Sequence, residues 1–202
     1  MKMEAAGIPV GCVVMAAGSA SRFGENKLTA DAGGKTLIER ALCAVPADKL
    51  SAVCVVTRFP EICRMAEQFG FEWVWNEHPE SGIGETIRLG TCALAKRCGA
   101  IVYQVADQPC LRRESVARLV DFYRAHPGSI AALSHGGVRG NPCIFPRDLF
   151  PELAALRGDA GGSAVIRSHI ERLILLETDA RELFDADTPL SLARLYPPGA
   201  NK

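Results

Sequence analysis

The residues best suited to chemistry follow a short apolar run, Val10–Met15, near the start of the chain. Small residues fill the next segment, Ala16–Ser21, and Arg22 and Lys27 come soon after it. Small side chains let backbone N–H groups approach a ligand closely, and clustered N–H groups favour an anion. Arginine can hold two phosphate oxygens at once, and lysine adds a point charge. We therefore predict that this loop binds a chain of phosphates.

Two common phosphate-binding motifs do not fit these residues. A dinucleotide-binding fingerprint needs G-x-G-x-x-G, whereas the glycines of the loop are Gly18 and Gly24. The segment Gly33–Thr36 (GGKT) looks like the end of a Walker A loop, but its opening glycine would fall on Thr29 and no strand precedes it. Neither motif explains the loop.

Acidic residues stand out in two places, and at the first of them a metal could bind. Asp107 directly follows an apolar run, Ala100–Ala106, and a carboxylate at the end of a strand can hold Mg²⁺. It could equally be the acid that begins the following helix. Asp185 and Asp187, which are separated by one residue, would point to opposite sides of an extended segment. Both could cap the helix after Pro189.

Apolar runs alternate with amphipathic segments along the chain. The predicted strands are Val10–Met15, Ala52–Thr57, Phe71–Asn76, Ala100–Ala106, Ser129–Ser134, Cys143–Phe145 and Glu171–Thr178. The predicted helices are Leu37–Val45, which opens on a capping box at Thr36, Pro60–Phe69, Gly84–Cys98, Arg113–Ala125, Arg147–Leu156, Gly162–His169 and Pro189–Leu195. Gly136–Pro142 is expected to be a turn-rich segment. This alternation predicts a three-layer α/β/α, Rossmann-like fold with a mainly parallel sheet.

Three candidate loops should meet at one edge of that sheet. In an open α/β sheet, ligands bind beyond the carboxyl ends of the strands. The glycine loop follows the first predicted strand, residues 76–86 follow the third, and residues 107–109 follow the fourth. We therefore expect the phosphate loop and Asp107 to share one site.

The pattern A-A-G-x-x-x-R-F-G-x-x-K in the first loop resembles the opening signature of nucleotidyltransferases that activate sugar phosphates, isoprenoid precursors and the molybdenum cofactor. More narrowly, it is similar to the molybdenum cofactor cytidylyltransferases. The resemblance implies a fold of the nucleotide-diphospho-sugar transferase type, in which the loop wraps a nucleotide triphosphate beside a magnesium ion. The residues it implies in nucleotide binding are Ala16, Ala17, Gly18, Ser19, Arg22, Lys27, Gly82, Gly84 and Thr86.

Other motifs of that family follow in the family's order, so that the resemblance runs from Met15 to Leu192. Gly82–Thr86 resembles G-x-G-x-S, which contacts the base and ribose, although it could merely be a glycine loop that begins a helix. Asp107–Pro109 matches an aspartate that binds magnesium in the family, and Asp185–Pro189 matches the D-x-D-T-P in which an aspartate supplies the second metal ligand. One of Asp185 and Asp187 would face this metal, and we favour Asp187. The catalytic residues implied are Arg22, Lys27 and Asp107.

Two segments resemble the parts of the family that line the acceptor pocket. The acceptor-binding residues they imply are Gly140, Asn141, Pro142 and Asp159. In the second segment the chain departs from the family's G-D-x-G-A-R, because Gly162 and Ser163 replace alanine and arginine. This removes a charge that could meet the acceptor's phosphate, and Arg167 one turn later could compensate.

Composition argues against several classes of partner. Lys and Arg number 23, as do Asp and Glu, so that the net charge is zero and no basic run could follow a nucleic acid. The longest apolar runs fall far short of the roughly 20 residues that cross a bilayer. Eight cysteines without a C-x-x-C pair suit reduced thiols in the cytoplasm. We expect one cytoplasmic domain that binds neither nucleic acid nor membrane.

The start of the chain does not favour a secretory signal. An apolar stretch follows Lys2, but Glu4 and Pro9 interrupt it. Arg22 and Lys27 stand where the cleavage region should carry no charge.

The resemblance implies one nucleotidyltransferase domain over residues 1–202, with a nucleotide-binding part at about 8–126 and an acceptor-binding part at about 127–195. The implied reaction moves CMP from CTP to the phosphate of the molybdopterin cofactor, with Mg²⁺ as cofactor and a molybdenum hydroxylase as a transient partner. Another nucleotide, or a sugar or isoprenoid phosphate as acceptor, is the alternative. A non-catalytic carrier of the molybdenum cofactor is a third, which Arg22, Lys27 and Asp107 argue against.

Overall fold

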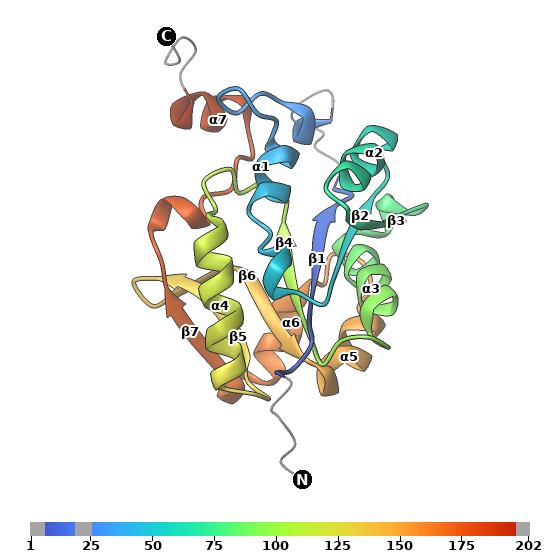
Figure 1. The fold of residues 1–202 in the computed structure, drawn as a ribbon, viewed down its shortest axis with the longest axis vertical. Helices are drawn as coiled ribbons and strands as arrows, with labels where there is room; N and C mark the ends of the chain where they lie inside the picture. Colours follow the sequence, from blue (N-terminus) through green and yellow to red (C-terminus); the bar gives the residue numbers. More distant parts are fainter. Residues whose placement is uncertain (1–6, 19–25, 197–202) are drawn as a thin grey trace.

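The protein is built on one central sheet with helices on both sides (Figure 1), and the computed structural model describes residues 7–18 and 26–196. In this part of the chain the sheet has seven strands, in the spatial order β3-β2-β1-β4-β6-β5-β7. In chain order the strands are β1 (Val10–Ala16), β2 (Ala52–Thr57), β3 (Glu72–Trp75), β4 (Ala100–Val105), β5 (Ile130–His135), β6 (Val138–Pro146) and β7 (Leu173–Glu177).

β1 lies inside the sheet, parallel to β2 on one side and to β4 on the other. β3 is parallel to β2, and β7 is parallel to β5. β6 runs antiparallel to both of its neighbours, β4 and β5. The predicted mainly parallel sheet is therefore confirmed. β1 is buried along almost its whole length, as expected for an apolar strand that is covered on both faces.

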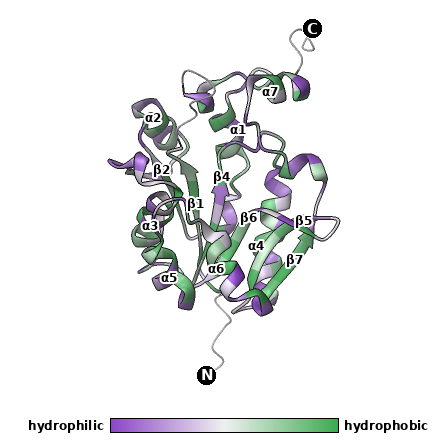
Figure 2. Cartoon of the chain, turned by 180° about the vertical axis from the view of Figure 1, so that it is seen from behind, coloured by the Kyte–Doolittle hydropathy of each residue, from purple (hydrophilic) through white to green (hydrophobic). Residues whose placement is uncertain are grey.

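Successive residues of β1 face two separate hydrophobic cores, which makes the fold a three-layer α/β/α structure. Cys12 and Val14 pack into the first core and Val13 into the second. The helices over the first core are α1 (Leu37–Cys43), α2 (Pro60–Gln68), α4 (Arg113–Ala125) and α7 (Pro189–Leu195). Those over the second are α3 (Ile83–Leu94), α5 (Phe150–Ala155) and α6 (Gly162–Ser168). Figure 2 shows hydrophobic residues along the central strands and hydrophilic ones mainly on the outer helices and loops.

Short 3₁₀ helices join several of these elements. They are Lys27–Thr29, Ala47–Lys49, Pro79–Ser81, Arg147–Leu149, Ile170–Arg172 and Ala180–Leu183. Within the residues that the structure describes, no helix combines the length and the apolar character needed to cross a membrane.

Two helix starts follow from capping boxes. At α1, the Glu39 N–H donates to the Thr36 hydroxyl at 3.3 Å and the Glu39 carboxylate accepts the Thr36 N–H at 2.6 Å, as predicted. At α7, Thr188 and Ser191 make the same reciprocal pair. Since Thr188 caps α7, the alternative in which the preceding aspartates cap this helix is wrong.

The prediction of a turn-rich segment at Gly136–Pro142 is wrong for most of its length. Gly136 and Gly137 alone make the turn, with φ of 56° and 78°, and β6 begins at the next residue. Residues 140–142 stay extended opposite a shift in the register between β5 and β6, which lies between Ala132 and Ser134. Strand pairing across this bulge therefore overrides the local preference of Gly and Pro for turns.

All eight cysteines lie within the described residues and are free thiols. Five are buried, namely Cys12, Cys54, Cys63, Cys98 and Cys143. This agrees with the prediction that most of them are reduced thiols in the core.

Candidate functional site

A cavity of about 290 Å³ lies at the carboxyl ends of β1 and β4. The order of the strands reverses between β1 and β4, and such a reversal opens a crevice in α/β sheets. All three loops that were expected to meet here contribute to the wall, so their convergence is confirmed. They supply Ala17, Gly18, Pro79, Gly82, Ile83, Thr86, Ala106 and Asp107.

Lys27 joins the first loop to the acidic residues of the site. Its Nζ lies 2.7 Å from Oδ2 of Asp107 and 3.4 Å from Oδ1 of Asp187. Burial by itself would lower the pKa of Lys27, but the charges and hydrogen bonds of Asp107 and Asp187 outweigh burial and raise this pKa. The side chain is therefore a firmly held cation on the wall of the cavity.

The position of Lys27 follows from the residues on either side of it. The Asn26 side chain caps the 3₁₀ helix by accepting the Leu28 N–H at 3.2 Å and donates to Glu61 at 3.0 Å. Leu28 is buried in the first core. One anchor on each side therefore directs Lys27 toward the cavity.

The two aspartates near the end of the chain have different surroundings. The backbone N–H of Ala186, which lies between them, donates to the Asp107 carbonyl at 2.8 Å and brings the segment to the end of β4. Asp187 contacts Lys27, whereas Asp185 accepts a hydrogen bond from Gln108 Nε2 at 3.0 Å. Burial and the nearby charge of Asp107 raise the pKa of Asp185. Asp187 therefore shares a cation with Asp107, and Asp185 does not.

The carboxylates of Asp107 and Asp187 could bind a divalent cation, because both already converge on one positive charge. Among the described residues, no three acidic, histidine or cysteine side chains gather into a closed metal site. Mg²⁺ suits such a sparse set of ligands, since it is usually bound by one or two carboxylates together with phosphate oxygens and water. The N-cap of α4 is Arg112 and the helix begins at Arg113, so the alternative in which Asp107 is the acid that begins this helix is wrong.

The start of α3 forms another wall of the cavity. Gly82 is the N-cap of this helix, with φ of 78°, and a Cβ there would lie 2.4 Å from the Gly158 carbonyl oxygen. Thr86 is buried, and its hydroxyl accepts a hydrogen bond from Asn76 Nδ2 at 3.3 Å. Gly82 thus both begins the helix and lines the cavity with Thr86.

Two of the predicted nucleotide-binding residues serve packing in the described structure. Gly84 donates its N–H to the Gly158 carbonyl at 3.0 Å, and a Cβ there would lie 2.9 Å from Arg157 N. Ala16 ends β1 fully buried, and its carbonyl accepts the Thr57 hydroxyl at 3.0 Å. Neither residue is part of the cavity wall described above.

The close approach of Gly82 to Gly158 explains the unexpected position of Asp159. It was expected on the acceptor side, yet it lines the cavity together with Gly82 and Thr86. The close packing of Gly82 against Gly158 brings the neighbouring Asp159 to this wall. Ser19 and Arg22 lie outside the described residues.

A second cavity adjoins the first, and a third adjoins the second. The second, of about 100 Å³, shares Met15, Ile83 and Val105 with the first. The third, of about 490 Å³, shares Arg139, Asn141 and Ser163 with the second.

β6 explains why these cavities adjoin the first. Its pairing with β4 is antiparallel and includes Tyr103 opposite Cys143, so the residues before Cys143 extend beside the carboxyl end of β4. Gly140 and Asn141, which were predicted to bind the acceptor, line the third cavity, whereas Pro142 is buried within β6.

The Ser163 hydroxyl accepts a hydrogen bond of 2.8 Å from Nη2 of Arg139. Arg167, which could have compensated for the serine, is exposed on α6 and absent from the walls of the three cavities. Sequence reasoning missed Arg139, and the available signal was its place directly before the Gly140–Pro142 segment.

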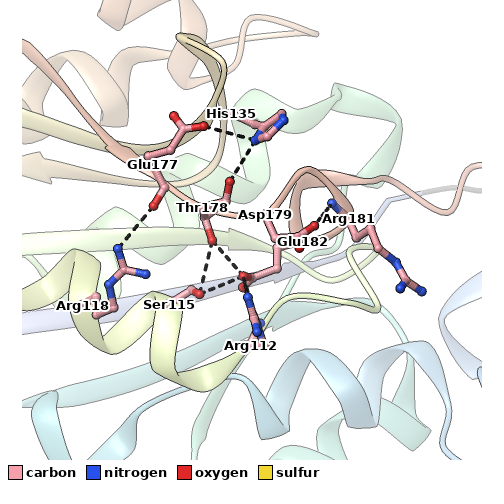
Figure 3. Close-up of polar contacts among 9 residues, drawn as sticks. All are labelled: Arg112, Ser115, Arg118, His135, Glu177, Thr178, Asp179, Arg181 and Glu182. Carbon is pink, nitrogen blue, oxygen red and sulfur yellow. Dashed lines mark hydrogen bonds and ion pairs between the residues drawn. The ribbon is translucent and has the colours of Figure 1, made fainter.

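A polar network around Glu182 (Figure 3) holds the 3₁₀ helix Ala180–Leu183, which comes shortly before Asp185 and Asp187 in the chain. Glu182 is 2% exposed and accepts hydrogen bonds from the Arg112 guanidinium at 2.6 Å, from Ser115 at 3.0 Å and from Thr178 at 2.8 Å. Burial alone would raise the pKa of Glu182, but these hydrogen bonds outweigh burial and lower it. The ionised carboxylate therefore ties the 3₁₀ helix before Asp185 to the start of α4.

Comparisons with known proteins identify the family of the chain. Residues 12–173 match the family model described as a MobA-like NTP transferase domain. The chain is 31% identical over 197 residues to the purine catabolism protein PucB of Bacillus subtilis (strain 168), a match that covers 88% of this chain and 91% of that protein.

Two solved structures show the same fold. Rv0371c from Mycobacterium tuberculosis H37Rv has a TM-score of 0.77 at 24% identity, over 93% of this chain and 97% of that one. The same protein has also been solved in complex with manganese. A nucleotidyl transferase from Methanothermobacter has a TM-score of 0.78 at 20% identity, over 93% of this chain and 95% of that one.

Proposed function

This chain belongs to the family of MobA-like NTP transferase domains, and we propose that within this family it moves CMP from CTP to the terminal phosphate of the molybdopterin cofactor, releasing pyrophosphate. The family inferred from the sequence motifs is thereby confirmed. One observation carries the proposal. Lys27 is held between Asp107 and Asp187 on the wall of a cavity that is otherwise lined largely by small and apolar residues.

The reaction needs positioning and neutralisation of charge more than proton transfer. An oxygen of the acceptor's phosphate attacks the α-phosphorus of CTP, and the bond from that phosphorus to the bridging oxygen of the β-phosphate breaks. A phosphate monoester is largely ionised near neutral pH, so the attacking oxygen needs no general base. Lys27 offsets the charge that grows on the leaving pyrophosphate, because its ammonium faces the cavity from the end of the first loop. Arg22 would add a second positive charge.

We propose Mg²⁺ as the cofactor, with Asp107 and Asp187 as its protein ligands. When bound, the ion would neutralise phosphate charge and fix the orientation of the phosphates. The shared contact of both carboxylates with Lys27 supports this choice, and so does the manganese complex of the mycobacterial protein. In this proposal Lys27 moves from the carboxylates to the phosphates when the metal and the nucleotide enter together.

The choice of CTP rests on the sequence. The A-A-G opening and the D-x-D-T-P ending resemble the cytidylyl branch of the family, whereas members that use GTP usually open with A-G-G. The cavities lined by Asn141 and Gly140 adjoin the nucleotide cavity and supply room for the acceptor. The relative from Bacillus subtilis is named for purine catabolism, so we propose a molybdenum hydroxylase of purine breakdown as the recipient of the product.

The test begins with thermal shifts of the purified protein in Mg²⁺ with CTP, GTP, ATP or UTP, followed by pyrophosphate release with CTP and the molybdopterin cofactor. We expect stabilisation that is largest for CTP, requires the metal, and needs a higher Mg²⁺ concentration in Asp107→Asn. Asp121→Asn is the control, because Asp121 lies on α4 and pairs with Lys49. Preference for another nucleotide would contradict the cytidylyl assignment. Binding of molybdopterin without any response to nucleotides would point instead to a carrier of the cofactor.

A further inference from the structure

Arg139 stands out among the side chains near the acceptor-side cavities. It lies near the start of β6 and is partly buried. Nη2 donates to the Ser163 hydroxyl at 2.8 Å, and Nη1 donates to Cys143 Sγ at 3.5 Å. Both contacts are neutral, because burial raises the pKa of the Cys143 thiol and keeps it protonated.

The guanidinium of Arg139 has no carboxylate within ion-pair distance among the described residues. Some arginines of the described structure are paired, such as Arg112 with Glu182 and Arg172 with Asp148, and others, such as Arg64 and Arg167, are exposed without such a pair. A partly buried cation that is held only by a hydroxyl and a thiol keeps its charge available for an anionic ligand.

Its position places this charge where an acceptor has to lie. Arg139 lines both the second and the third cavity, and the second shares Met15 and Val105 with the nucleotide cavity. Lys27 is the basic residue of the first cavity, and His135 is the other basic residue of the third. Among the described residues that line the second and third cavities, Arg139 is therefore the one with a permanent positive charge.

We propose that Arg139 recognises the acceptor by binding its phosphate monoester, and so restricts the enzyme to anionic acceptors. The planar guanidinium can hold two phosphate oxygens at once, a geometry that a lysine cannot reproduce. Ser163 serves as the neutral partner that orients the guanidinium from the start of α6. The positive charge expected at position 163 thus comes from β6. This inference rests on the proposed function, because it names the group that the acceptor site selects.

The test separates recognition of the acceptor from binding of the nucleotide. Arg139→Gln keeps a donor for Ser163 but removes the charge, and Arg139→Lys keeps the charge but loses the planar fork. We expect Arg139→Gln to raise KM for the molybdopterin cofactor by roughly 10- to 100-fold, the usual effect of losing a charged hydrogen bond. KM for CTP and the thermal shift with CTP should not change, and Arg139→Lys should fall in between.

Two further arginines serve as comparisons. Arg64→Gln is the matched control, because Arg64 is exposed on α2 over the opposite core. Arg167→Gln tests the competing arginine of α6. The proposal is wrong if Arg139→Gln leaves KM for the acceptor unchanged, if it raises both KM values equally, or if Arg167→Gln produces the larger effect. Running the series with glucose 1-phosphate as well as molybdopterin distinguishes a sugar phosphate from the cofactor as the source of the phosphate.

A second measurement keeps this inference separate from the proposed function. Inorganic phosphate is titrated by calorimetry into the wild type and into Arg139→Gln, both without nucleotide. Weaker binding or loss of one binding event in the variant supports an anion site at Arg139 even if no nucleotide transfer is found. Identical titrations would overturn the inference even in an active cytidylyltransferase.

Discussion

The ammonium nitrogen of Lys27 lies 2.7 Å from a carboxylate oxygen of Asp107, although 80 positions separate the two residues in the chain. This ion pair joins the loop after β1 to the end of β4, on the wall of the candidate nucleotide cavity. Asp107 would exchange this partner for a metal ion when a nucleotide binds, and Lys27 would then be released to the phosphates. The predictions below test the parts of this arrangement.

Lys27→Met should abolish most turnover while the fold stays intact. The methionine keeps the length of the apolar stem but removes the charge that faces the leaving pyrophosphate. Loss of one group that stabilises developing charge typically costs about 10²- to 10³-fold in kcat, so we expect a fall of that size. Steady-state kinetics measure the fall, and circular dichroism checks the fold. Lys49→Met is the matched control, because Lys49 forms a more exposed pair with Asp121. Activity equal to wild type would remove Lys27 from the site.

The effects of replacing Asp107, Asp187 and Asp185 on the Mg²⁺ requirement should follow the contacts of these residues with Lys27. Asp107→Asn and Asp187→Asn each remove a carboxylate that faces Lys27, whereas Asp185→Asn changes a side chain that bonds to Gln108. We expect the Mg²⁺ concentration for half-maximal stabilisation by CTP to rise about tenfold or more in the first two variants, and less in the third. Thermal shifts over a magnesium series measure this order. A larger effect of Asp185→Asn would exchange the roles of the two aspartates.

Glu182 should make stability depend on pH. Its pKa in the folded protein is below the ordinary value of 4.5, so its stabilising contribution is complete above that value and is lost as the pH falls through the lower pKa of the folded state. Glu182→Gln should remove this loss and give a flatter curve of Tm against acidic pH. Near neutral pH the variant should be less stable by about 1–2 kcal/mol, the cost of charged hydrogen bonds lost to an exposed partner. Arg112 is 61% exposed, so its charge remains solvated in the variant.

A matched variant distinguishes positioning from stability at this network. Glu114→Gln changes an exposed glutamate in the first turn of α4 and should leave the acid limb of the curve as in the wild type. If Glu182 also positions the segment of Asp185 and Asp187, Glu182→Gln should raise the Mg²⁺ requirement at a temperature where the variant is fully folded. An unchanged requirement would limit Glu182 to stability.

Much of the fold could be predicted because hydrophobic spacing and helix caps are local. Ala52–Thr57, Arg113–Ala125 and Pro189–Leu195 have the predicted bounds, and Thr36 forms the predicted capping box. The segment before Pro142 could not be predicted in the same way. Its glycines and proline favour turns locally, and the pairing with β5 that keeps it extended depends on residues distant in the chain.

In the candidate site, too, some residues could be predicted from local sequence and others could not. Lys27 and Asp107 could be proposed because each follows a predictable strand, and the sheet brings strand ends together. Asp159 reaches the candidate nucleotide cavity through the close approach of Gly82 to Gly158, which no pattern of spacing encodes. Arg139 was missed for a similar reason. Its proposed role in binding the acceptor depends on the neutral hydrogen-bond partners and the cavities that surround it in the folded structure.

Gly82 provides the last test, since both its backbone and its surroundings exclude a side chain. Its φ of 78° strains any other residue, and a Cβ would lie 2.4 Å from the Gly158 carbonyl oxygen. Gly128 is the matched control, because its φ of 85° imposes a similar strain while a Cβ there would meet no atom within 4 Å. Gly128→Ala should cost about 1–3 kcal/mol from strain alone and leave the response to CTP intact. Gly82→Ala should cost more and weaken CTP binding, because the clash pushes Gly158 and Asp159 away from the cavity wall. Urea unfolding measures the loss of stability in the two variants. Equal losses would show that the close approach to Gly158 adds nothing to the cost of a side chain at Gly82.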